Sequence, residues 1–346
     1  MKRVMVVALV LLCVTGTVFA TGAVETTQQV YKLRSSTNLA PGGTVGRGLQ
    51  YFVDELNKAA GGRIEATANF GSELGTQREQ VEMTKTGSLE MVVSAPGTGP
   101  GAYIPQLQAI DLPYLFNDEE HFVRVLNGVE AEMSRLLAPH NFVAIGGQNM
   151  GFRHMLIKQR PVSKPADLQG LKMRGPNPVF VQMFQALGAS GVTTDWNDVY
   201  TSLQTGVVDG QMNPLSIIAM AKFQEVQKYI TLTNHLYAPY VWVINPRFYS
   251  SLPADLQRVV DDASRTAILA GRGLSRIIDA SDKGLPTLAA RMEVYVPNTS
   301  EMRQFRDVTM PAAKAFMTDK YKAEGTQWVD RFYSAIEAAE KELGLR

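Results

Sequence analysis

Apolar residues along this chain recur with two different periods. Residues 30–36 alternate between apolar and polar side chains, as a strand does, and Leu49, Phe52, Val53 and Leu56 then recur at the spacing of one helical face. The same patterns predict further strands at 63–70, 89–94, 142–147, 229–232, 240–245 and 292–296, and a short one that ends at Arg174. They predict helices at 45–59, 76–86, 118–137, 179–187, 197–205, 215–226, 253–291, 300–318 and 325–343. Strands that alternate with helices in this way predict an α/β fold with a mostly parallel sheet.

The chain is long enough for two compact lobes. Its 346 residues exceed the usual size of a domain built on one core. Residues 151–158 are predicted to cross into the second lobe, near Gly151, and strand 240–245, just after Pro239, is predicted to return. We therefore predict lobe I at 30–150 plus 239–278, lobe II at 151–238 plus 279–324, and a C-terminal helix at 325–346 that packs across both.

The first 20 residues have the pattern of a signal peptide. Lys2 and Arg3 precede an apolar run at 4–14, and the small residues of Val18-Phe19-Ala20 suit a signal peptidase. We predict an exported, periplasmic protein that is cleaved near Ala20 and begins with a disordered lead-in at 21–29. The apolar run is short for a membrane span, and no later segment has the length and apolarity of one.

Charge and cysteine content exclude several function classes. Removal of residues 1–20 changes the formal net charge from +1 to −1, which argues against a nucleic acid or an anionic membrane as partner. The single cysteine, Cys13, lies inside the predicted signal peptide and follows two leucines, an unfavourable context for lipid attachment. The mature protein would contain no thiol, and therefore no disulfide, cysteine nucleophile or thiolate metal site.

The segment GLKMRGPNP places an arginine at the end of a predicted strand. Gly175, Pro176 and Pro178 turn the chain directly after Arg174. In open α/β sheets ligands bind at the carboxyl ends of strands, and a guanidinium there matches a carboxylate or a phosphate. The alternative is a structural arginine paired with a nearby acid.

Motifs for metal binding and catalysis are missing from the sequence. The four histidines, His121, His140, His154 and His235, include no pair at metal-binding helical spacing. The glycine-rich segment 42–48 lacks the spacing of a dinucleotide-binding loop, and the sequence contains neither a GxSxG elbow nor a phosphate-binding loop. We predict a protein without metal or cofactor that is not an enzyme.

Several longer segments resemble one family of transport proteins. GLKMRGPNP, VYTSLQTGVVDGQMNPL, FGSELGTQREQVEMTKTGSLEM, LPYLF and KFQEVQKYITLTNH are similar to the substrate-binding subunits of TRAP transporters, the DctP-type solute receptors. The resemblance extends from about Tyr31 to the last helix. It implies a two-lobe periplasmic binding protein fold in which each lobe is a mixed, mostly parallel sheet flanked by helices. It also implies that the long helix at 253–291, broken only at Gly284 and Pro286, crosses both lobes.

The resemblance also assigns roles to cationic and amide side chains. Arg174 would hold the carboxylate of a ligand, and Asn213 would orient Arg174, with a plain turn residue as the alternative for Asn213. The family usually reads DGQEN at this point, whereas here Met212 replaces the acid. Arg153 would be a second cation for the ligand, or else part of an interlobe salt bridge.

Three further residues match family positions at the cleft, and two tyrosines in the segment that joins the lobes could also line it. Asn38 follows the first strand, Gln77 opens a helix, and Trp196 begins the helix predicted to face Arg174. Tyr237 and Tyr240 flank Pro239 and offer hydroxyl groups and flat rings. The alternatives are helix capping and surface solvation for Asn38 and Gln77, core packing for Trp196, and packing at the hinge for the tyrosines.

Together these features predict a periplasmic receptor for a small organic acid. It would close its lobes on the ligand, and the resemblance implies that it delivers the ligand to the small and large membrane subunits of an ion-coupled TRAP permease. We expect a monomer. Two alternatives remain: a receptor that feeds a sensor or chemoreceptor, and an exported α/β enzyme.

Overall fold

The computed structural model describes residues 29–281 and 284–345. The predicted signal peptide at 1–20 and most of the predicted lead-in at 21–29 lie outside the described residues. The strands are β1 (Tyr31–Ser36), β2 (Ile64–Asn69), β3 (Met91–Ser94), β4 (Val143–Ile157), β5 (Lys172–Gly175), β6 (Ser190–Thr193), β7 (Gly210–Pro214), β8 (Tyr229–Ile244) and β9 (Glu293–Tyr295). The helices are α1 (Thr44–Ala59), α2 (Gln77–Thr86), α3 (Glu119–Leu137), α4 (Pro178–Ala186), α5 (Val199–Gln204), α6 (Leu215–Met220), α7 (Pro246–Ser251), α8 (Ala254–Ala280), α9 (Leu285–Ala289) and α10 (Thr299–Glu342).

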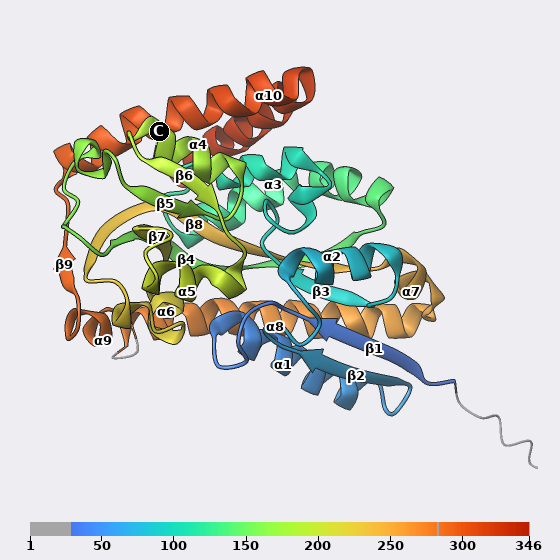
Figure 1. Ribbon diagram of the computed structural model, residues 1–346. Coiled ribbons are helices and arrows are strands. Elements are labelled where there is room, and N and C mark those ends of the chain that lie inside the picture. The colour runs from blue at the N-terminus through green and yellow to red at the C-terminus, as the bar shows by residue number, and fades with distance from the viewer. Residues whose placement is uncertain (1–28, 282–283, 346) are drawn as a thin grey trace, which may run out of the picture.

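The strands form one mixed sheet with helices on both faces (Figure 1). Its order is β2-β1-β3-β8-β4-β7-β5-β6, with β9 beside β8. β1 pairs in parallel with β2 and β3, and β5 pairs in parallel with β6 and β7. The antiparallel pairs are β3 with β8, β8 with β4, and β4 with β7. This arrangement confirms the predicted α/β fold with a mixed, mostly parallel sheet.

Two strands in the middle of the sheet are longer than the sequence predicts, and each extends from one part of the sheet into the other. The predicted strand at 142–147 continues as β4 to Ile157, and the predicted strands at 229–232 and 240–245 are both part of β8. We call the part built on β1, β2 and β3 the first half and the part built on β5, β6 and β7 the second half. The chain therefore crosses between the halves in β4 and β8, which are hydrogen-bonded to each other. The ladder is irregular there, with register shifts between Asn149 and Phe152 and between Arg153 and Met155.

Each half has an apolar core on both faces of the sheet. In the first half α1 and α8 cover one face, where the rings of Phe52 and Trp242 meet edge to face at 5.5 Å. α2, α3 and the end of α10 cover the other face. In the second half α4 and the start of α10 lie on one face, and α5, α6 and α9 on the other. Burial of a large apolar side chain contributes roughly 1.5–3 kcal/mol, so these four clusters account for most of the stabilisation.

Two long helices connect the halves (Figure 1). α8 contacts α1 in the first half and α6 in the second, which confirms the predicted helix across both lobes, although it ends at Ala280 rather than near 291. α10 joins the two predicted C-terminal helices and bends at Lys322, whose φ of 53° is not helical. Its first part packs on α4 and its second part on α3.

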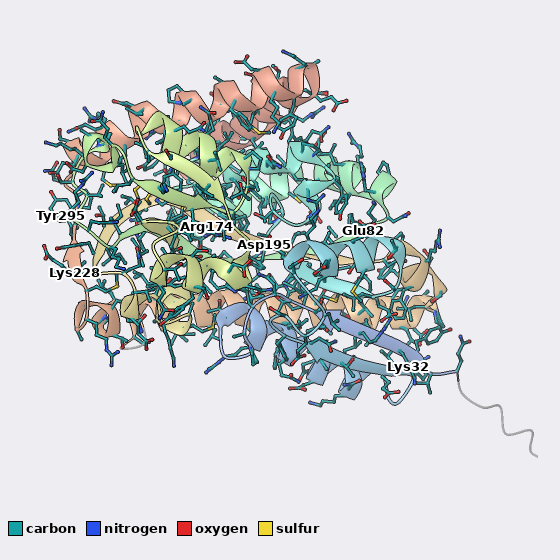
Figure 2. All side chains as sticks on the ribbon, in the orientation of Figure 1. Lys32, Glu82, Arg174, Asp195, Lys228 and Tyr295 are labelled. Carbon is teal, nitrogen blue, oxygen red and sulfur yellow. The ribbon has the colours of Figure 1, made fainter. Side chains whose placement is uncertain are left out.

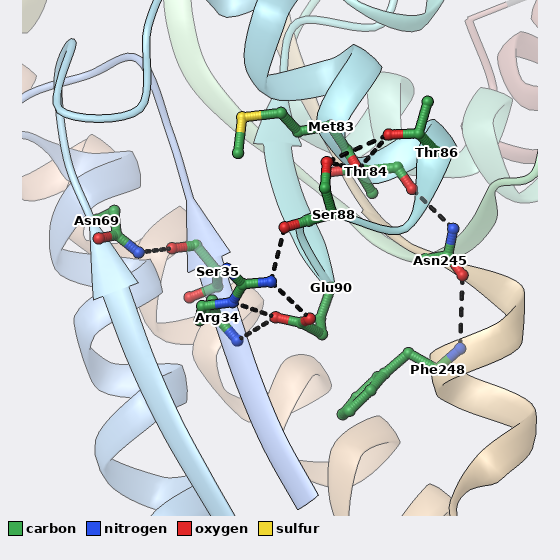
Figure 3. Close-up of polar contacts among 10 residues, drawn as sticks. All are labelled: Arg34, Ser35, Asn69, Met83, Thr84, Thr86, Ser88, Glu90, Asn245 and Phe248. Carbon is green, nitrogen blue, oxygen red and sulfur yellow. Dashed lines mark hydrogen bonds and ion pairs between the residues drawn. The ribbon is translucent and has the colours of Figure 1, made fainter.

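Polar side chains join several elements of the first half (Figure 3). Arg34 of β1 donates to both carboxylate oxygens of Glu90, each at 2.9 Å, and to the Ser88 carbonyl at 2.6 Å. Asn245 caps α7 and donates to the Thr84 carbonyl of α2 at 2.8 Å. These bonds tie β1, the turn before β3, α2 and the end of β8 into one unit.

Candidate functional site

A narrow cavity of about 30 Å³ lies between the two halves. Its lining comes from the ends of β1, β3 and β5, the middle of β4 and β8, and the starts of α2 and α6. The lining residues are Asn38, Leu39, Gln77, Ala95, Thr98, Met150, Arg153, Arg174, Pro176, Trp196, Asn213, Ile217 and Tyr240. Seven of the eight predicted site residues therefore meet at one place, although they are spread over 203 positions of the chain.

Arg174 stands at the end of β5, as predicted, and is only 4% exposed. Its Nε and Nη2 donate to the Thr194 carbonyl at 2.9 and 2.7 Å. Burial, and then the nearby Arg153, lower the pKa of Arg174 to about 9, while Asp195 beside it acts in the opposite direction (Figure 2). The guanidinium is therefore charged at neutral pH and has donors left for a second acceptor, since arginine carries five N–H groups.

Arg153 of β4 is a second buried cation in the same cavity, 7% exposed. Its Nη1 donates to the Met212 carbonyl at 3.1 Å and to Oδ1 of Asn213 at 2.9 Å. Its Nε is buried without a hydrogen-bond partner. Among the described residues neither Arg153 nor Arg174 forms an ion pair, so the interlobe salt bridge considered for Arg153 is absent there.

The prediction that Asn213 orients Arg174 is wrong. Asn213 binds Arg153 and Gln211 rather than Arg174, and it lies in strand β7 rather than in a turn. The reason is the register of the strands: β7 pairs with β4 along Arg153–Ile157, which brings Asn213 next to Arg153. β5 pairs with β7 only at Met173 and Gly210, whereas Arg174 pairs with Val192 of β6 on the other side, so the register does not place Arg174 beside Asn213.

Amide, hydroxyl and aromatic groups complete the lining. Gln77 donates to Ser94 Oγ at 2.7 Å, and Oδ1 of the buried Asn38 has no hydrogen-bond partner. Burial raises the pKa of Tyr240 to about 12, although both arginines favour its ionised form. Trp196 is half-buried at the start of its helical segment and packs edge to face on Phe223 at 5.7 Å. The cavity thus offers cationic, neutral polar and flat apolar contacts.

Tyr237 is the predicted site residue that the structure places elsewhere. Its ring packs among Phe116, Phe122 and Phe152 in the core of the first half, with centroids 4.8–6.5 Å apart. Side chains alternate along a strand, so residues three apart on β8 point to opposite faces. With Tyr240 in the cavity, Tyr237 faces the core, and burial raises its pKa.

Some lining residues carried little signal in the sequence. Thr98 lies in a glycine- and proline-rich loop at 96–105, whereas Leu39, Ala95, Met150 and Ile217 are apolar residues that the sequence does not set apart from core residues. In the described ranges no group of three or more His, Cys, Asp or Glu side chains is arranged to hold a metal ion. Of the helices described, none combines the length and the apolarity that a membrane crossing needs.

Comparison with known proteins identifies the family. Residues 35–320 match the family model described as bacterial extracellular solute-binding protein, family 7. A solute-binding protein of Verminephrobacter eiseniae is 35% identical over 286 residues, which cover 82% of this chain and 83% of the relative.

Solved structures support the same family assignment. A TRAP periplasmic solute-binding protein of Shewanella oneidensis with bound succinate has a TM-score of 0.82 at 26% identity, covering 89% of this chain and 99% of the other. A sugar acid-binding protein of Advenella mimigardefordensis in complex with galactonate has a TM-score of 0.81 at 27% identity, with coverages of 89% and 99%. The predicted resemblance is confirmed: the chain belongs to the DctP family of extracellular solute-binding proteins.

Proposed function

We propose that this protein binds a small organic acid in the cavity between the halves and delivers it to an ion-coupled TRAP permease. The observation that carries the proposal is the pair of buried guanidiniums, Arg153 and Arg174, whose described hydrogen bonds go to carbonyl and amide oxygens only. The carboxylates that act on them from nearby, Asp111 and Asp195, form no ion pair with either arginine among the described residues. A buried cation that no ion pair neutralises is destabilising by several kcal/mol. A ligand carboxylate offsets this through charge-assisted hydrogen bonds.

The proposed roles follow from the contacts. Arg174 binds the carboxylate through donors that Thr194 does not use, and the Thr194 carbonyl keeps the guanidinium in place. Arg153, held by Asn213, provides the second charge. Asn38, Gln77, Thr98, Trp196 and Tyr240 then discriminate among carboxylates by shape and by hydrogen bonding. Trp196 supplies a flat surface of the kind that packs against an apolar or ring-shaped portion of a ligand.

The protein would act in the periplasm, as a receptor rather than an enzyme. The signal-peptide pattern at 1–20 supports export, and the named structural relatives are binding proteins, one of them periplasmic by name. We assign the first and second halves to the predicted lobes, which would move about the irregular part of β4 and β8 near Gly151 and Pro239. The closed form would then dock on the membrane subunits.

A thermal-shift screen of organic acids tests the proposal. Succinate and galactonate, the ligands of the two structural relatives, are the first compounds, with neutral sugars as controls. A ligand at about 100 times its Kd stabilises the native state by about 2.7 kcal/mol, which raises Tm by several degrees. The proposal fails if neutral sugars raise Tm and no carboxylate does.

Small-angle scattering tests the movement. With the acid that gives the largest thermal shift, the radius of gyration should fall on saturation. Equal curves with and without that acid would contradict closure while leaving the binding assignment intact.

A further inference from the structure

A buried carboxylate lies directly behind the lining of the cavity. Asp111 ends a short 3-10 helix of the first half, Pro105–Asp111, and is 5% exposed. Its Oδ2 accepts a hydrogen bond from Nδ2 of Asn177 at 2.6 Å. Asn177 is the N-cap of α4 in the second half, where its Oδ1 accepts from the Val179 N–H at 3.0 Å. One amide therefore joins a helix of the second half to a carboxylate of the first.

The Asp111–Asn177 pair is enclosed by the loop that lines the cavity. A Cβ atom at Gly97 would lie 1.9 Å from Oδ2 of Asp111 and 3.2 Å from Nδ2 of Asn177. Thr98 Oγ1 lies 3.4 Å from the same Nδ2, and Thr98 and Pro176 both line the cavity. The pair is thus in place only while the two halves are in contact.

Burial and the polar neighbours of Asp111 act on its pKa in opposite directions. Burial raises the pKa of Asp111 to about 7, while the Asn177 hydrogen bond and the positive charge of Arg153 on β4 act in the opposite direction. The Tyr240 hydroxyl on β8 also interacts with Asp111, whose charge raises the pKa of Tyr240. Separation of the halves would expose the carboxylate to water and return its pKa toward the ordinary range of an aspartate.

A bound ligand carboxylate would shift Asp111 toward its neutral form. Its negative charge offsets that of Arg153, which favours the ionised form of Asp111, and closure removes water from the Asp111 carboxylate; both effects favour the neutral acid. We propose that Asp111 takes up a proton when an organic anion binds and the halves close, so that the receptor binds the anion together with one proton. The inference rests on the proposed function. The proton comes from solvent and sits on Oδ1, while Oδ2 keeps the bond from Asn177.

Proton uptake on binding determines whether the ligand affinity rises or falls with pH. The bound, closed form holds more protons than the free form, so affinity falls as pH rises between the two pKa values of Asp111. The slope is at most about tenfold per pH unit for one proton. The organic acid itself is ionised throughout the neutral range and adds no slope there.

Titration calorimetry in two cationic buffers of different ionisation enthalpy, bis-Tris and Tris at pH 7, counts the protons. Succinate and galactonate are the probes. The parent protein should take up a substantial fraction of one proton per ligand. Asp111→Asn keeps an oxygen for Asn177 and should lower the uptake to near zero. Asp279→Asn is the matched control, since burial raises the pKa of Asp279 as well, whereas the group that lowers it is the Ser216 backbone rather than an arginine. No uptake by the parent, or uptake that survives in Asp111→Asn, would overturn the proposal.

A second measurement needs no ligand and separates this inference from the proposed function. If neither probe binds, the assignment of these acids fails, whereas Asp111 is still tested by scattering of the free protein at pH 6 and pH 8. The parent should be more compact at pH 6, and Asp111→Asn should give the same curve at both. A parent that does not respond to pH would refute the role of Asp111. Circular dichroism and thermal unfolding check that each variant is folded.

Discussion

Arg34 and Arg174 stand in opposite electrostatic surroundings. Arg34 lies on the surface of the first half, with half of its side chain exposed, and forms a two-point ion pair with Glu90 that raises its pKa (Figure 3). Arg174 is buried between the halves, binds a backbone carbonyl, and has a lowered pKa. An arginine whose charge is already paired contributes to local structure, whereas a buried arginine without a carboxylate is available to a ligand that brings one.

Replacement of Arg174 should have the largest effect. Arg174→Ala is expected to lower the affinity for the bound acid by about 2–5 kcal/mol, because the ligand carboxylate is left without its main partner. Tm in the absence of ligand should stay the same or rise, since a buried charge is removed. Calorimetry and thermal unfolding measure the two quantities. Unchanged affinity would show that Arg174 is a structural residue.

The next largest effect is expected at alkaline pH, where the affinity should depend on the charge of Arg174 and not on that of Arg34. As pH rises through about 9, Arg174 loses its proton and the site loses a charge, so affinity should fall by up to about tenfold per unit. Asp111→Asn is the appropriate background because it removes the titration proposed for the neutral range. Calorimetry from pH 8 to pH 10 gives the profile, and a flat profile would contradict the lowered pKa.

Asn213 should act through Arg153 and not through Arg174. Asn213→Ala is expected to weaken binding by roughly 1 kcal/mol, the scale of one hydrogen bond. In double-mutant cycles the Asn213 and Arg153 substitutions should be coupled by more than about 0.5 kcal/mol, while those of Asn213 and Arg174 should add independently. Coupling to Arg174 instead would restore the pairing expected from the sequence.

Replacement of Arg34 should have the smallest effect. Arg34→Ala is expected to lower the free energy of unfolding by about 1 kcal/mol or less, because exposed ion pairs are weak and screened by salt. Affinity for the acid should not change. Urea denaturation at low and high salt, with calorimetry alongside, tests both statements. A large loss of affinity would mean that the first half controls the cavity over a long distance.

Local signals predicted most of the fold and the position of Arg174. Helix α2 begins at the Thr76–Glu79 capping box and ends at Gly87, whose φ of 87° suits glycine, and the sequence marks both ends. Gly175 and Pro176 likewise mark the end of β5. Such features depend on a few neighbouring residues, so periodicity and turn residues suffice to find them.

Features that depend on strand register were harder to predict. Asn213 meets Arg153 because β7 lies antiparallel to β4, and one sequence does not state that alignment. Recognition of β8 as one strand would have placed Tyr237 and Tyr240 on opposite faces. Asp111 is surrounded by apolar residues in the sequence, and nothing local shows that its partner is 66 residues away.

The continuity of β4 and β8 restricts how the molecule can change shape. A flexible linker would let the halves rotate in any direction. Two strands that stay hydrogen-bonded to each other allow rotation about one axis only. Rotation within the sheet plane would break ladder bonds, whereas bending out of that plane can be absorbed at the irregular stretch around Asn149 and Gly151. The proposed closure would then be limited to opening and shutting about one axis, and a ligand would meet the same two faces each time.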